Sequence, residues 1–96
     1  MKRDGVLRIL AANREKLGRF SVKSIALFGS VARDEAVPGS DIDLLVEFSE
    51  PVGLFDFIRL KNHLEDLLQA PVDLVTPDAL KDRIREKILR EAIRAA

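Results

Sequence analysis

Residues 25–46 read IALFGSVARDEAVPGSDIDLLV, and this stretch determines the expected fold. The apolar residues at its start predict a strand over residues 24–28 that ends at Gly29-Ser30, followed by a short helix over residues 31–35. Residues 42–48 predict a second strand. The connection between the two strands is too short for a full crossover helix, so we expect a mixed sheet rather than a wholly parallel one.

The remainder of the chain alternates helical and strand patterns. Apolar residues at helical spacing predict helices over residues 4–18 and 54–69, and residues 72–75 predict a third strand. Asp78 is expected to cap a last helix. The order αβαβαβα predicts one α/β (α+β) domain over residues 1–96, with helices flanking a small mixed three-stranded sheet.

Charge is balanced overall but segregated along the chain. Lys plus Arg and Asp plus Glu number 16 each, while net charge is +6 over residues 1–33, −8 over residues 34–73 and +2 over residues 74–96. The acidic middle would suit a cation site, and an ordinary solvated acidic surface would give the same pattern. Nucleic-acid binding is not expected, because no global positive field exists and the stacking residues Trp and Tyr are absent.

Several other site classes are disfavoured. Cysteine is absent, which excludes disulfides and thiolate metal sites. No apolar run approaches the ~20 residues of a membrane span and no signal-like segment is present, so we expect a cytoplasmic protein without membrane association.

His63 is the only histidine and is expected to be a surface or partly packed residue. The basic residues of the last helix alternate with acidic ones, which predicts a solvated helix face.

Carboxylates follow the predicted strands in a pattern that suits metal binding. Asp41 and Asp43 stand at i and i+2 where the second strand begins, within residues 40–46, so in extended backbone they face the same side, roughly 6–7 Å apart. Two such carboxylates can share a pair of divalent ions about 3.5–4 Å apart. Asp73 lies in the otherwise apolar third strand, where it either points outward or joins that pair. A cluster of three carboxylates without cations should have raised pKa values.

The glycine-serine turn between the first strand and the short helix is suited to anions. Backbone N–H groups at such a corner, with Gly29 and Ser30, can contact phosphate oxygens. Ser30 could instead serve as the N-cap of the short helix. Arg33, one turn further, could bind phosphate or pair with Asp34, Glu35 or a strand-two carboxylate. The serine before Asp41, Ser40, is expected to shape the turn.

The string GSVARDEAVPGSDIDLLVEF, residues 29–48, resembles the signature of the DNA polymerase beta-like nucleotidyltransferases. It resembles in particular their smallest branch, the minimal nucleotidyltransferases that pair with HEPN-domain proteins. The resemblance continues through residues 72–75 and the last helix. It implies a polymerase beta-like fold in which Asp73 is the third carboxylate, ligating metal at the attacking hydroxyl. It also favours Ser30 as a phosphate ligand.

The resemblance implies an enzyme that moves NMP, with AMP from ATP as the expected case, onto a hydroxyl of another protein. Asp41 and Asp43 would hold two Mg²⁺ ions, with Gly29, Ser30 and Arg33 binding the nucleotide. The implied acceptor is a tyrosine of a HEPN toxin, which makes this chain a type VII-like antitoxin. The chain contains no tyrosine, so the modified residue must lie on another protein.

Two other functions are compatible with the sequence. A non-catalytic antitoxin could silence its partner by covering it, although such a protein has no reason to keep three aspartates and the glycine-serine turn together. Transfer onto RNA or a small molecule would need a base- or sugar-binding surface, and the sequence indicates none. Because the chain offers little to read a nucleobase, a partner protein or a second copy is expected to complete the pocket.

Overall fold

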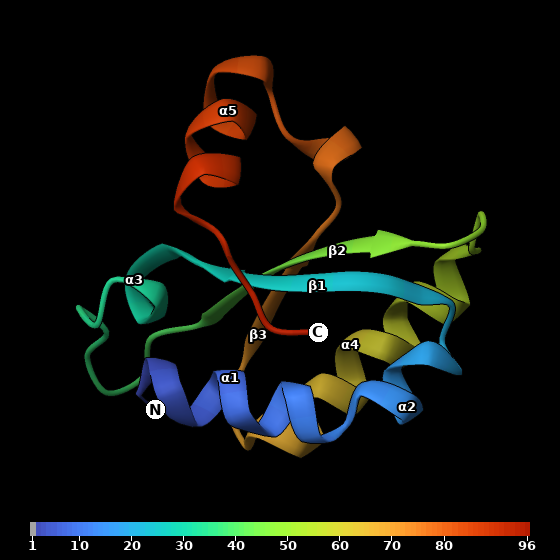
Figure 1. The fold of residues 1–96 in the computed structure, drawn as a ribbon, viewed down its shortest axis with the longest axis horizontal. Helices are drawn as coiled ribbons and strands as arrows, with labels where there is room; N and C mark the ends of the chain where they lie inside the picture. The colour runs from blue at the N-terminus through green and yellow to red at the C-terminus, as the bar shows by residue number, and fades with distance from the viewer. Residues whose placement is uncertain (1) are drawn as a thin grey trace.

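The computed structural model describes residues 2–96, whose elements are shown in Figure 1. In chain order these elements are α1 (Arg3–Ala12), α2 (Arg14–Gly18), β1 (Val22–Phe28), α3 (Gly29–Ala32), β2 (Ile42–Phe48), α4 (Leu54–Leu68), β3 (Val72–Val75), a 3-10 turn (Pro77–Ala79), α5 (Asp82–Glu91) and β4 (Ile93–Arg94). No helix among the described residues is long and apolar enough to cross a membrane.

The strands form one mixed sheet in the order β3-β2-β1-β4. β1 is antiparallel to both β2 and β4, and β2 is parallel to β3. The predicted mixed sheet is therefore confirmed. The prediction of three strands is wrong, because β4 adds a fourth strand at the free edge of β1.

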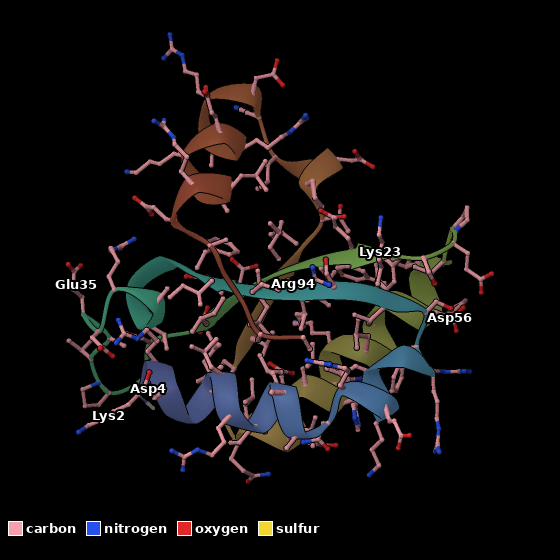
Figure 2. The ribbon with its side chains drawn as sticks, in the orientation of Figure 1. Lys2, Asp4, Lys23, Glu35, Asp56 and Arg94 are labelled. Carbon is pink, nitrogen blue, oxygen red and sulfur yellow. The ribbon has the colours of Figure 1, made fainter. Side chains whose placement is uncertain are left out.

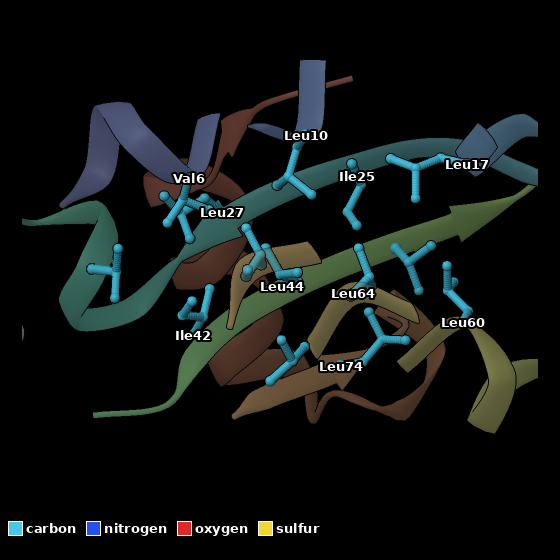
Figure 3. Packing of buried hydrophobic residues seen from close by; sticks show 14 of the residues in the cluster. Val6, Leu10, Leu17, Ile25, Leu27, Ile42, Leu44, Leu60, Leu64 and Leu74 are labelled. Atoms are coloured by element: carbon cyan, nitrogen blue, oxygen red, sulfur yellow. The ribbon is translucent and has the colours of Figure 1, made fainter. Parts of the chain in front are cut away.

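Helices α1, α2 and α4 cover one face of the sheet, as Figure 1 shows. Alternate residues of the central strands point into this layer, and Ile25, Leu27 and Leu44 are fully buried there. Leu10 from α1 and Leu64 from α4 are likewise inaccessible and pack against these strands (Figure 3). The core thus fixes which side chains of β1 and β2 must face the opposite side of the sheet.

The first predicted helix is divided in two. α1 ends at Ala12, and α2 starts at Arg14 and ends at Gly18 as expected. The side-chain amide of Asn13 donates to the Ile9 carbonyl at 2.8 Å, so it competes with the backbone for a helical acceptor. This local competition explains a break that apolar spacing alone does not reveal.

The C-terminal part departs further from the prediction. Asp78 lies inside the 3-10 turn Pro77–Ala79, and α5 begins only at Asp82, with Lys81 at its N-cap and no side-chain capping hydrogen bond. The assignment of Asp78 as helix cap is therefore wrong. α5 extends away from the sheet in Figure 1, and none of its described residues is buried. The chain then returns to the sheet as β4.

Candidate active site

The candidate site lies on the sheet face opposite α1 and α4. In β2, Ile42 and Leu44 are buried beneath the helices, so Asp43 between them faces the other side. Asp43 is paired with Asp73 across the parallel ladder and with Phe28 across the antiparallel one. The strand register therefore places the second and third predicted carboxylates side by side.

Gly29 lies directly against the Asp43 carboxylate. Its φ of +73° is in the left-handed region, which side chains other than glycine adopt with strain. A Cβ at this position would overlap Asp43 Oδ2 and lie 2.9 Å from Asp43 Cγ. Glycine is thus required twice, once by the backbone turn and once by the space that the carboxylate occupies.

The neighbouring carboxylates affect the pKa of Asp43. Burial raises the pKa of Asp43, and the charges of Asp73 and Asp41 raise it further. A hydrogen bond shared with the Asp73 carboxyl group acts in the same direction, whereas the nearby Arg33 charge opposes it. The predicted rise in pKa is therefore confirmed for Asp43, which sits in a local excess of negative charge.

The carboxylates fit a divalent cation without forming a finished cage. Within residues 2–96, no three acidic or histidine side chains converge closely enough to make a preformed ligand set. Asp43 and Asp73 are nevertheless direct partners in the parallel ladder, and the charges of both Asp73 and Asp41 raise the pKa of Asp43. Oxygen donors that repel one another in this way suit Mg²⁺, which takes one or two carboxylates and completes its shell with water and phosphate.

The two serines of the motif, Ser30 and Ser40, lie in different local structures. α3 begins at Gly29, its N-cap is Phe28, and no side chain caps it, so the alternative in which Ser30 is the N-cap is wrong. Ser30 lies within the first turn of α3, next to the Gly29–Asp43 contact. Ser40 shapes the turn before β2, as predicted, because its hydroxyl accepts from the Val37 N–H at 3.1 Å.

Arg33 is engaged by two carboxylates. Its Nε donates to Glu35 Oε2 at 3.1 Å, and its Nη1 lies 3.5 Å from Glu91 Oε2 on α5. Asp34, another predicted partner, instead pairs with Arg3 at 3.5 Å. The predicted pairing of Arg33 with Glu35 is therefore confirmed. Glu91 was not predicted, because it stands 58 residues further along the chain and no local pattern connects the two.

A groove on the described part of the chain lies away from these carboxylates. It measures about 870 Å³ between the ends of β2 and β3 and the start of α4, and its described lining contains none of the predicted site residues. Figure 2 shows Glu35, which pairs with Arg33, at one end of the molecule and Asp56 of α4 at the other. The candidate site lies at the carboxylates because the Asp43–Asp73 pair and the Gly29 contact come together there.

His63 is partly packed, as predicted. Its ring stacks on Phe20 with 5.0 Å between ring centroids. It belongs to α4, on the covered face of the sheet.

Comparisons with known proteins agree with this geometry. The sequence profile described as "Nucleotidyltransferase domain" matches residues 6–95. A relative from Thermococcus cleftensis, named protein adenylyltransferase MntA, is 45% identical over 86 residues, which cover 88% of this chain and 87% of the relative.

Solved structures share the fold. A protein provisionally described as a minimal nucleotidyltransferase has a TM-score of 0.84 and 43% identity, covering 97% of this chain and 95% of the other. A second structure is a tri-AMPylated HEPN toxin from Shewanella oneidensis in complex with its MNT antitoxin. The matched chain has a TM-score of 0.60 and 20% identity, covering 88% of this chain and 70% of the other, so it shows similarity of fold alone.

Proposed function

Since the chain belongs to the nucleotidyltransferase domain family and is a nucleotidyltransferase, we propose that it transfers AMP from ATP to a hydroxyl group of a partner protein. The observation that carries this proposal is the in-register pairing of Asp43 with Asp73, next to Gly29 and within reach of the Asp41 charge. The name of the T. cleftensis relative, protein adenylyltransferase, supports AMP as the transferred group.

Asp41, Asp43 and Asp73 are the residues that would hold Mg²⁺. Two such ions, when bound, would neutralise the charge that develops on the phosphates as the α-phosphate is attacked. The mutual repulsion that raises the Asp43 pKa gives these carboxylates a reason to bind cations. Asp43 has to lose its proton for this purpose, and the Arg33 charge favours that loss.

The reaction proceeds by in-line displacement. The acceptor hydroxyl oxygen forms a bond to the α-phosphorus while the bond to the bridging oxygen of pyrophosphate breaks. Asp73, the exposed member of the pair, accepts the hydroxyl proton. Gly29 and Ser30 hold the β- and γ-phosphates at the start of α3, and Arg33 contributes a guanidinium there. Pyrophosphate leaves with the electron pair of the broken bond.

A tyrosine of a HEPN toxin is the acceptor that we propose. The support is the tri-AMPylated HEPN toxin that accompanies a structurally similar antitoxin chain. This chain has no tyrosine, so self-modification at tyrosine is excluded by composition. Modification of a toxin would make the protein an antitoxin that acts by catalysis.

The test is label transfer from ATP tagged at its α-phosphate, in lysate of the native host with Mg²⁺. We expect a labelled protein band with the wild type and none with the Asp41→Asn/Asp43→Asn double variant. Glu47→Gln is the matched control, because Glu47 is an exposed carboxylate of the same strand β2. Mass spectrometry of the labelled band identifies the acceptor residue.

A non-catalytic antitoxin is the second candidate, and exposed apolar side chains on α5 favour it. Ile84 and Leu89 remain 50% and 48% exposed, which would suit a protein interface. In one outcome, neither the wild type nor the double variant labels any protein, and the same partner protein co-purifies with both. The chain would then inhibit its partner by binding alone. That result would refute catalytic transfer.

A further inference from the structure

Arg33 is held between carboxylates that come from two distant parts of the chain. Glu35 lies two residues away and contacts Nε at 3.1 Å, whereas Glu91 belongs to the last turn of α5 and lies 3.5 Å from Nη1. The three side chains are 45%, 65% and 37% exposed in the order Arg33, Glu35, Glu91. Solvent therefore weakens both pairs, and a stronger anion can displace either carboxylate.

The Glu91 pair connects the candidate site to α5, a helix that lies largely in solvent. None of the described residues of α5 is buried. Among the salt bridges of residues 2–96, Arg33–Glu91 is the only one that joins α5 to another element. The position of α5 and the state of the Arg33 guanidinium are thus physically linked.

The charges around Arg33 oppose the binding of a polyanion. One guanidinium faces two carboxylates, and Asp43, whose pKa its charge lowers, is also close. A triphosphate brings several further negative charges to the start of α3. Because a guanidinium already paired with carboxylates is less available to phosphate, Glu91 and the triphosphate compete for the same donors.

We propose that Glu91 is a positioning residue that withholds Arg33 from the nucleotide until the triphosphate displaces it. The proposal rests on the proposed function, because it assumes that nucleotide binds at the start of α3. Release of Glu91 frees the last turn of α5 from α3. Nucleotide binding and the position of α5 then influence each other reciprocally.

The test compares nucleotide affinity among four variants and the wild type. The probe is a non-hydrolysable ATP analogue with Mg²⁺, and its dissociation constant is measured by calorimetry for Glu91→Gln, Glu86→Gln, Arg33→Gln and Arg33→Gln/Glu91→Gln. Glu86 is the matched control, since it is exposed on the same helix and its carboxylate forms no ion pair among the described residues.

We expect Glu91→Gln to bind the analogue about two- to fivefold more tightly, the range that an exposed ion pair supports. Glu86→Gln should bind like the wild type. In the Arg33→Gln background the additional Glu91 substitution should have no effect, because Glu91 acts through Arg33. The KM for ATP should fall in Glu91→Gln while kcat stays unchanged, which a general loss of structure would not produce.

Two results would overturn the proposal while leaving the proposed function intact. One is wild-type or weaker analogue binding by Glu91→Gln. The other is a gain in affinity that persists without Arg33, because the effect would then not pass through the guanidinium. If the wild type and all variants fail to bind the analogue, the nucleotide site itself is misassigned and both proposals fail.

Discussion

Replacing Asp43 by Asn should stabilise the protein in the absence of metal. The pKa of Asp43 is raised by burial and by the charges of Asp73 and Asp41, so its ionised form is disfavoured in the fold. A group whose pKa rises on folding stabilises the fold at a pH below its unfolded pKa. This contribution to stability is lost as the pH rises through the folded pKa. At pH 7 the charge of Asp43 therefore works against folding, and Asn removes that charge while keeping a hydrogen-bonding amide.

The strand spacing sets the expected magnitude. Asp43 and Asp73 are direct partners in the parallel ladder, where neighbouring strands lie about 4.8 Å apart. Two unit charges at that separation repel by about 0.9 kcal/mol in water and by about 3.5 kcal/mol at an effective dielectric constant of 20. Because Asp73 is exposed and Asp43 is half-buried, the lower end applies. We expect a gain of about 1 kcal/mol, or roughly 4–8 °C in Tm for a domain of this size.

Thermal unfolding in EDTA, followed by circular dichroism across a pH series, measures this gain. Glu47→Gln, a charge change on the same strand, should leave Tm nearly unaltered. The advantage of Asp43→Asn should shrink as pH falls and the wild-type carboxyl group becomes protonated. Added Mg²⁺ should raise the Tm of the wild type more than that of Asp43→Asn. An Asp43→Asn protein that is no more stable than the wild type in EDTA at pH 7 would refute the electrostatic reasoning.

Three further substitutions test the fold around the site. Gly29→Ala should lower the free energy of unfolding by at least about 1–2 kcal/mol in a urea titration, because residue 29 has a left-handed backbone. The variant should also lose label transfer because the new Cβ displaces Asp43. Retained transfer would contradict the close contact. Leu64→Ala should lower the free energy of unfolding by about 2–5 kcal/mol in the urea titration, since Leu64 is completely buried. A smaller loss would show that the core can collapse around the gap. Phe55→Ser should change stability by less than about 0.5 kcal/mol because Phe55 is 78% exposed, and a larger loss would place Phe55 in a packed contact.

The central strands and α4 could be predicted because local pattern and tertiary context agree there. β2 and β3 have the predicted bounds, and α4 ends one residue earlier than expected, at Leu68. In each of these elements, the spacing of the apolar residues along the sequence places them on the face that packs into the core. The short connection between β1 and β2 correctly predicted a mixed sheet, in which these two strands pair antiparallel.

The C-terminal elements could not be predicted because they depend on a distant strand. Residues 92–96 continue a helix-compatible composition, yet Ile93 and Arg94 pair with Leu27 and Ala26 of β1. The free edge of β1 supplies hydrogen bonds that outweigh local helix preference. The partnership of Arg33 with Glu91 escaped prediction for the same reason, since it follows from where α5 is anchored.

The parallel register of β2 and β3 makes the length of the connector after α4 a determinant of the site. α4 ends at Leu68, Gln69 takes a left-handed conformation with φ of 53°, and the Pro71 carbonyl accepts from the Ile42 N–H at 2.9 Å. Removing one residue from this connector would exchange the two faces of β3, turning a carboxylate into the core and a leucine into solvent. Whether the connector between α4 and β3 has an odd or an even number of residues therefore decides, as much as residue identity does, whether Asp73 can lie beside Asp43.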